Sequence, residues 1–232
     1  MDLMSGAVWG AFGAIVVANI LLSGDNAVVI AMAARSLPTS QQKKAIFWGS
    51  AAAIVLRIIL TVAAVQMLQL PYLKIVGALA LLWIGVQLLV DTEDEGEVKA
   101  HGTLFAAVRT ILVADLVMSI DNVIAVAAAA DRAPENYRVP LLIIGLATSI
   151  PLIIAGSTLL MKVMDRFPII IVLGAGLLGF LAGQMFVTDP ASAAWFKVHV
   201  PEAEYIVGAA GAILVVVIGK WLHRRGQRLE PA

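Results

Sequence analysis

Seven apolar stretches, each long enough to cross a lipid bilayer, occupy most of this chain of 232 residues. A membrane-spanning helix needs about 20 predominantly apolar residues. Hydrophobic residues make up 61% of the chain and charged residues 14%, against about 45–50% and about 25% in soluble domains. The sequence therefore predicts an all-α membrane protein with seven transmembrane helices, at residues 7–34, 45–69, 72–90, 103–130, 139–161, 168–188 and 205–222.

The polar segments between these stretches are short and carry the proline and charged residues of turns. We expect one transmembrane domain over residues 1–232, with an acidic cytoplasmic loop at 91–102 and a basic cytoplasmic tail at 223–232. The N-terminus lacks a basic region and a cleavage signal, so the first stretch is expected to remain as a spanning helix. The chain has no cysteine, which excludes disulfides and thiolate metal sites.

Basic residues are unevenly distributed between the two sides of this predicted bundle. Loops on the cytoplasmic side of membrane proteins carry an excess of Lys and Arg. Placing the basic tail in the cytoplasm puts eleven basic residues inside and four outside, with Arg57 counted on neither side because it lies within a span. We therefore predict a multi-pass protein of the inner (plasma) membrane, with its N-terminus outside and its C-terminus in the cytoplasm.

A polar octapeptide occurs twice, each time inside an apolar stretch. Residues 19–26 read Asn-Ile-Leu-Leu-Ser-Gly-Asp-Asn, and residues 115–122, 96 positions later, read Asp-Leu-Val-Met-Ser-Ile-Asp-Asn. A carboxylate at the centre of a bilayer costs about 2.5–3.5 kcal/mol on insertion scales, and this chain carries Asp25, Asp115 and Asp121 there. A duplicated acidic pattern at membrane depth indicates an ion pathway.

The duplication extends beyond this motif. Gly49 matches Gly145 at the same offset of 96, and Gln87 matches Gln184 at an offset of 97. Because each unit would contain three spans, the second unit must enter the membrane upside down relative to the first. We therefore predict two inverted three-helix repeats, at 7–90 and 103–188, plus one extra C-terminal helix at 205–222; the alternative is a chance match between apolar sequences. In transporters built this way the substrate site lies near the midplane, between the repeats.

Helical periodicity separates the polar positions of each motif copy. Positions one, five and eight share one face of the helix, whereas Asp25 and Asp121, at position seven, point about 120° away if the helices are regular. Either each helix packs on two sides, or the helix is unwound at residues 23–26, where Ser, Gly, Asp and Asn are weak helix formers. We expect a partial break in the first span and a more regular fourth span, where Ile120 replaces Gly24.

The two motif copies supply many oxygen atoms and neither imidazole nor thiolate. Hard divalent cations prefer such oxygen ligands, about six for magnesium or manganese and about six to eight for calcium. Met118 would add a thioether that favours manganese, or would simply pack, and the acidic set as a whole could instead form interhelical hydrogen bonds. The candidate metal ligands are Asp25, Asp121, Asp115, Asn26, Asn122, Asn19, Ser23, Ser119 and Met118.

Arg57 lies near the middle of the second span, about a dozen residues or about 18 Å of helix from either end. This distance is too long for its side chain to reach the membrane surface, so we expect Arg57 to face the bundle and pair with a carboxylate. Three carboxylates and one guanidinium leave a net charge of −2, which one divalent cation would neutralise. Arg57 is equally consistent with a fixed structural pair to one aspartate, and both roles can hold together.

Residues 23–31 and 115–123, with these motifs, resemble the two signature segments of the TerC family of membrane proteins. The short seven-span form is similar to the bacterial YjbE-type branch, and the family is grouped with the LysE-type exporters. This resemblance implies manganese export, although the family was named for tellurium resistance. It also implies that Asp25 and Asp121 are metal ligands, with Asn26, Asn122 and Asp115 beside them.

We therefore predict a secondary transporter, not an enzyme, that exports a divalent cation from the cytoplasm by alternating access. Manganese is the first candidate for the cargo, with calcium or another divalent cation as alternatives; no cofactor is required, and coupling to proton entry is a hypothesis. The expected partners are the metal ion and the lipid bilayer, not nucleic acid, and a homo-oligomer is left open. The rival interpretations are an intramembrane aspartyl protease and a non-transporting membrane subunit of a metal-stress or tellurium-resistance complex.

Overall fold

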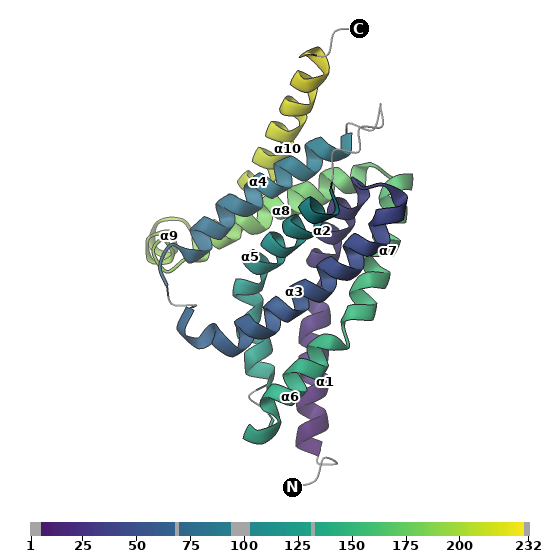
Figure 1. Ribbon diagram of the computed structural model, residues 1–232. Helices are drawn as coiled ribbons and strands as arrows, with labels where there is room; N and C mark the ends of the chain where they lie inside the picture. The colour runs from purple at the N-terminus through teal and green to yellow at the C-terminus, as the bar shows by residue number, and fades with distance from the viewer. Residues whose placement is uncertain (1–5, 68–69, 94–102, 131–132, 230–232) are drawn as a thin grey trace.

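The computed structural model describes residues 6–67, 70–93, 103–130 and 133–229; within these ranges the side chains at 7, 62–67, 92–93, 121, 124 and 226–229 are not described. This part of the chain forms ten helices and no strand. Figure 1 shows that α1 begins at one end of the bundle and that α10 ends at the other. The helices are α1 (Gly6–Leu21), α2 (Gly24–Arg35), α3 (Thr39–Met67), α4 (Leu73–Glu93), α5 (Leu104–Ala130), α6 (Glu135–Ala147), α7 (Ile150–Arg166), α8 (Ile169–Thr188), α9 (Ala193–His199) and α10 (Ala203–Leu229).

Several of these helices are long and apolar enough to cross a membrane. Five segments meet this condition by themselves, in α3, α4, α6 with α7, α8 and α10. The pair α1 and α2 meets it as one broken span, bent by 47°. The described residues thus support five or six spans in an all-helical protein, and the predicted seven-span inverted repeat is not confirmed. The remaining predicted span corresponds to α5, a 27-residue helix that contains Asp115 and Asp121.

The first span is broken inside its motif copy, as the sequence predicts, but the break lies at residues 22–23, and residues 24–26 of the predicted unwound segment are helical. α1 ends at Leu21, and α2 begins at Gly24. Ser23 between them has φ −116° and ψ 0°, outside the helical region. The corresponding segment of α5 is one continuous helix. This difference between the two copies follows from Gly24, because glycine is a weak helix former and its counterpart in α5 is isoleucine.

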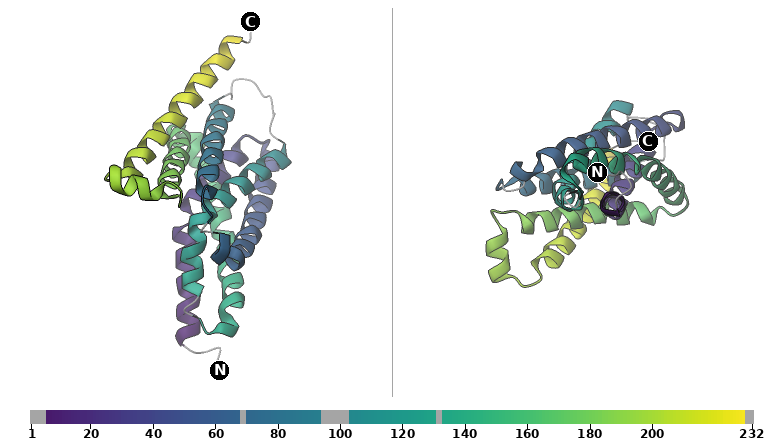
Figure 2. Two further views of the ribbon diagram at one scale, coloured as in Figure 1. Left: turned by 90° about the vertical axis from the view of Figure 1, so that its left-hand side faces the viewer. Right: turned by 90° about the horizontal axis from the view of Figure 1, so that it is seen from below.

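Several helix boundaries differ from the sequence prediction. The predicted continuous span at 139–161 is divided between α6 and α7, because Pro151 in the first turn of α7 has no N–H to continue the backbone ladder. The short helix α9 was not expected, and α10 continues through most of the predicted tail at 223–232. Figure 2 shows α10 running obliquely from the turn at α9 beside α8 and α4, with its C-terminal end projecting beyond the bundle. The predicted acidic loop at 91–102 lies almost entirely outside the described residues.

Glycines allow close helix contacts at two kinds of position. A Cβ atom on Gly179 or Gly183 of α8 would collide with backbone atoms of α10, so these small residues allow the two helices to pack with their backbones in close contact. A Cβ on Gly49 would lie 2.7 Å from Ile111, and one on Gly145 would lie 2.6 Å from Ile15. Ile15 and Ile111 are also 96 residues apart. The two contacts are therefore equivalent under the sequence duplication.

Asp189 joins the end of α8 to the beginning of α4. Its side chain is fully buried, and its carboxylate accepts backbone N–H groups of Tyr72 at 2.9 Å, Lys74 at 3.0 Å, Ile75 at 3.3 Å and Ala191 at 2.8 Å. Burial raises the pKa of Asp189, but these hydrogen bonds together hold the pKa below its ordinary value. The carboxylate thus satisfies N–H groups at the start of α4 that have no partner within the helix.

Candidate metal site

Arg57 is the centre of a buried polar cluster between α1, the break, α3 and α5. Only 1% of its surface is exposed. Its Nη2 pairs with Asp115 Oδ1 at 2.5 Å, and its Nε donates to Ser119 Oγ at 3.1 Å. Its Nη1 donates to Asn19 Oδ1 at 2.8 Å and to Ser23 Oγ at 3.0 Å. We call these five residues the Arg57 cluster. The expected pairing of Arg57 with a carboxylate is confirmed.

The Arg57 cluster contains equivalent residues from both motif copies. Asn19 corresponds to Asp115, and Ser23 corresponds to Ser119, each at the offset of 96 residues. The guanidinium therefore contacts both members of two duplicated pairs. Within each copy the serine also donates to the residue one turn earlier, Ser23 to Asn19 at 3.2 Å and Ser119 to Asp115 at 3.3 Å. The guanidinium of Arg57, from α3, thus bonds to both motif copies at once.

Asp25 and Asn26 lie in the first turn of α2, directly after the break. The Asp25 carboxylate is half-buried and accepts the backbone N–H of Asn26 at 2.8 Å, which suits an anionic group at a helix N-terminus. Asn26 is 3% exposed, and neither its Nδ2 nor its Oδ1 has a hydrogen-bond partner among the described residues. A buried amide without partners costs about 1–3 kcal/mol for each group. The Asn26 amide therefore has unused donor and acceptor capacity within the described part of the chain.

Asn122 connects α5 to the break itself. Its Nδ2 donates to the backbone oxygen of Leu22 at 3.1 Å. Leu22 lies between α1 and α2, where the helical ladder is interrupted. The amide oxygen of Asn122 is not used in this bond. Asn26 and Asn122 are repeat mates, yet only Asn122 makes a side-chain hydrogen bond in the described part of the chain.

Two other predicted ligands, Met118 and Asp121, belong to α5. Met118 is buried in the hydrophobic core of the bundle, so its role as a thioether ligand stays a prediction. Asp121 lies in α5, but its side chain is outside the described part of the structure. Among the side chains that are described, no group of three or more His, Cys, Asp or Glu residues could hold a metal. A site at the break would therefore combine carboxylates with amide and backbone oxygens.

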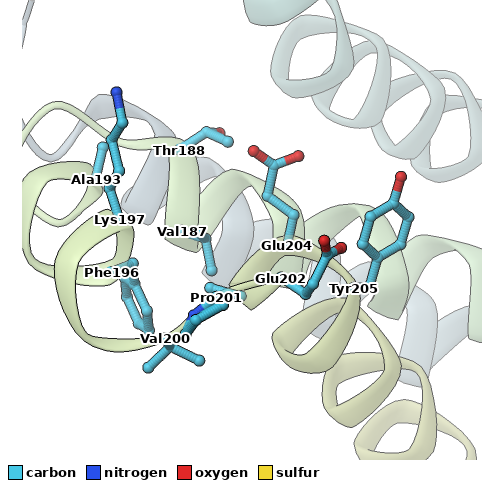
Figure 3. Close-up of a pocket in the computed structure, with 11 residues that line it drawn as sticks. Val187, Thr188, Ala193, Phe196, Lys197, Val200, Pro201, Glu202, Glu204 and Tyr205 are labelled. Carbon is cyan, nitrogen blue, oxygen red and sulfur yellow. The ribbon is translucent and has the colours of Figure 1, made fainter.

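A cavity of about 570 Å³ lies elsewhere, where α8, α9 and α10 meet. Figure 3 shows Lys197, Glu202, Glu204 and Tyr205 around it, together with apolar side chains. None of its lining residues belongs to the Arg57 cluster. This cavity is thus separate from the duplicated motif.

Sequence reasoning missed several buried polar residues. Ser157 of α7 and Ser50 of α3 are 0% and 1% exposed, and their hydroxyl oxygens have no hydrogen-bond partner among the described residues. α7 passes close to α2 beside Ser157, because a Cβ on Gly156 would lie 3.9 Å from that of Ala27. Single serines in apolar helices are common, and no pattern in the sequence distinguished these two.

Comparisons with known proteins identify relatives over nearly the whole chain. The family described as "Integral membrane protein TerC family" matches residues 4–227. The uncharacterized membrane protein YjbE of Bacillus subtilis is 45% identical over 171 residues, which cover 74% of this chain and 76% of the relative. The uncharacterized membrane protein YceF of the same organism is 25% identical, over 96% of this chain and 86% of the relative. The inner membrane protein YoaE of Escherichia coli is 25% identical over 96% of this chain but 44% of its own length. No solved structure matches the chain.

Proposed function

Because the chain belongs to the TerC family of integral membrane proteins, we propose that it is a secondary transporter that exports divalent metal cations, manganese first among them, from the cytoplasm. The observation that carries this proposal is the meeting of the two acidic motif copies at a broken helix. Broken helices at the midplane are the usual source of ion-coordinating groups in secondary transporters. The half-buried Asp25 and the unpartnered Asn26 lie at that break.

The charges of the site support a divalent cargo. Asp115 is paired with Arg57, so this pair contributes no net charge. Asp25 and Asp121 then remain, and two carboxylates balance one divalent cation. We propose that these two aspartates bind the metal, together with Asn26, Asn122 and backbone oxygens of the break. Hard oxygen ligands suit manganese, magnesium and calcium better than copper(I) or zinc.

Alternating access is supported by the way in which the two halves contact each other. α3 packs against α5, and correspondingly α6 and α7 pack against α1 and α2. The contact of Gly49 with Ile111 and that of Gly145 with Ile15 likewise join equivalent positions of the two halves. We propose that residues 7–90 and 103–188 are inverted repeats that rock against each other around the site. The excess of basic residues in one set of loops favours a cytoplasmic C-terminus and an external N-terminus.

Flux measurements with the purified protein in liposomes test this proposal. A manganese-sensitive dye inside the vesicles should report Mn²⁺ movement with the natural protein, and the Asp25→Asn and Asp121→Asn variants should reduce the rate at least tenfold. The Glu204→Gln variant is a matched control, because Glu204 is an exposed acid at the start of α10. Normal flux in correctly inserted Asp25→Asn and Asp121→Asn variants would refute the site. Metal binding without any flux would instead favour the non-transporting subunit.

A further inference from the structure

We infer that Arg57 sets the charge of the transport site: by neutralising Asp115, it keeps the site at two negative charges and so selects divalent over trivalent cations. This inference rests on the proposed function and adds a specificity-determining residue that does not contact the cargo. In this view Arg57 and Asp115 form one fixed unit, and Asp115 is not a metal ligand.

The hydrogen bonds of Arg57 support a fixed position. Each of its three guanidinium nitrogens donates within the cluster, and the residue is 1% exposed. Both oxygens of Asp115 are occupied, Oδ1 by Arg57 and Oδ2 by Ser119. A metal ion at Oδ1 would have to displace the buried guanidinium, which would leave that guanidinium without its carboxylate, and a metal ion at Oδ2 would have to compete with the Ser119 hydroxyl. Breaking a buried ion pair in this way is strongly unfavourable.

The differences between the motif copies show that these two charges occur as a pair. The counterpart of Asp115 is the neutral Asn19, and the counterpart of Arg57 is the apolar Ile153. The other acidic position, by contrast, is aspartate in both copies, at Asp25 and Asp121. The second copy therefore has one extra negative charge and the first repeat one extra positive charge, and the two are in contact. The net charge is the same as if both were absent.

The Arg57 cluster is close enough to the proposed ligands to influence them. Ser23 and Ser119, which both bond to the guanidinium, each precede a proposed metal-binding aspartate by two residues. Asp25 lies in the first turn of α2, two residues after Ser23, whose hydroxyl accepts a guanidinium N–H at 3.0 Å. For charges about 10 Å apart at an effective dielectric constant of about 20, one unit of charge changes the relative affinity for trivalent and divalent ions by about tenfold.

A cycle of four proteins tests this inference: the natural protein, Arg57→Gln, Asp115→Asn and the double variant. Purified protein is loaded with radioactive Mn²⁺, and La³⁺ is used to displace it, which gives the ratio of La³⁺ to Mn²⁺ affinity. Arg57→Gln removes a positive charge and should raise this ratio about tenfold. Asp115→Asn leaves the positive charge of Arg57 without its carboxylate and should lower the ratio of La³⁺ to Mn²⁺ affinity by a similar factor. The double variant restores two negative charges and should return the ratio to within about threefold of the natural value.

The Arg57→Lys variant separates charge from geometry. Lysine keeps the positive charge but not the planar fork of donors, so the ratio should stay near the natural value even if the protein becomes less stable. A purely structural Arg57 predicts that Lys and Gln variants behave alike. If Asp115→Asn does not fold, Arg57→Gln is compared with the double variant, and a raised ratio that persists in the double variant overturns the inference.

The results also distinguish this inference from the function on which it rests. A natural protein that binds no Mn²⁺ contradicts the proposed function itself. A natural protein that binds Mn²⁺, with the same La³⁺ to Mn²⁺ ratio in all four proteins, contradicts only the role of Arg57.

Discussion

Replacing Asp189 by asparagine should weaken the junction between α8 and α4. In the natural protein Oδ1 accepts the N–H groups of Tyr72 and Ala191, and Oδ2 accepts those of Lys74 and Ile75. An asparagine keeps one oxygen but places an NH₂ donor against two N–H donors. Hydrogen bonds to charged groups contribute about 1.5–3 kcal/mol each, so losing two should cost roughly 3 kcal/mol. For a chain of this size that corresponds to a decrease in melting temperature of roughly 6–12 °C.

The destabilisation caused by Asp189→Asn should depend on pH. Although burial raises the pKa of Asp189, the backbone N–H groups lower it more, so its pKa in the folded protein lies below the ordinary value of 3.8. A lowered pKa means that the folded state binds the proton less tightly than the unfolded state. The stabilisation is therefore complete above about pH 5 and is lost as the pH falls through the folded pKa. The difference between the natural protein and Asp189→Asn should stay constant from pH 8 to about pH 5 and narrow below about pH 4.

Thermal unfolding of the detergent-purified protein, followed by tryptophan fluorescence, measures both effects. Glu204→Gln removes an exposed acid from the same end of the molecule and should change the melting temperature by less than about 2 °C. Equal melting temperatures for Asp189→Asn and the natural protein at pH 7 would show that the four hydrogen bonds do not stabilise the junction. A difference that persists unchanged below pH 4 would show that the charge of Asp189 is not responsible.

Two further predictions concern packing in α2 and α8. Asn26→Leu removes a buried amide without described partners, so the variant should be at least as stable as the natural protein, while its Mn²⁺ affinity should fall tenfold or more. Melting curves and binding isotherms measure these two effects. A destabilised variant that keeps the natural Mn²⁺ affinity would contradict the prediction. Gly179→Ala should destabilise the protein by about 1–3 kcal/mol, because the new methyl group would overlap the backbone of Gly211. Gly176→Ala is the matched control, since its Cβ would meet its nearest neighbour at an ordinary 3.6 Å, and equal effects of the two substitutions would contradict the proposed contact.

The elements that the sequence predicted correctly are those with a strong local cause. Long apolar stretches form helices because hydrocarbon offers no other partner for backbone groups. The break after Leu21 follows from the weak helix formers at 23–26. A buried Arg57 required a carboxylate wherever it lay, because an unpaired charge in the bundle is too costly.

The features that the sequence did not predict depend on which segments lie next to each other in the folded protein. Periodicity could not decide which of three aspartates pairs with Arg57, because the crossing of α3 over α5 determines it. The sequence predicts no role for Asp189, because its N–H partners at 72–75 are more than 110 residues away in the sequence. The division between α6 and α7, by contrast, had a visible signal in Pro151.

The packing of α10 has a practical consequence for measuring motion. α10 packs against α8 and α4, and the glycine contacts with α8 bring their backbones too close for any side chain. We therefore expect α10 and α8 to move together as one rigid unit. Since the natural chain contains no cysteine, a single engineered thiol near Arg225 and another near Arg35 would carry a pair of spin labels. If the two repeats rock against each other as proposed, the distance between these labels should change when Mn²⁺ is added.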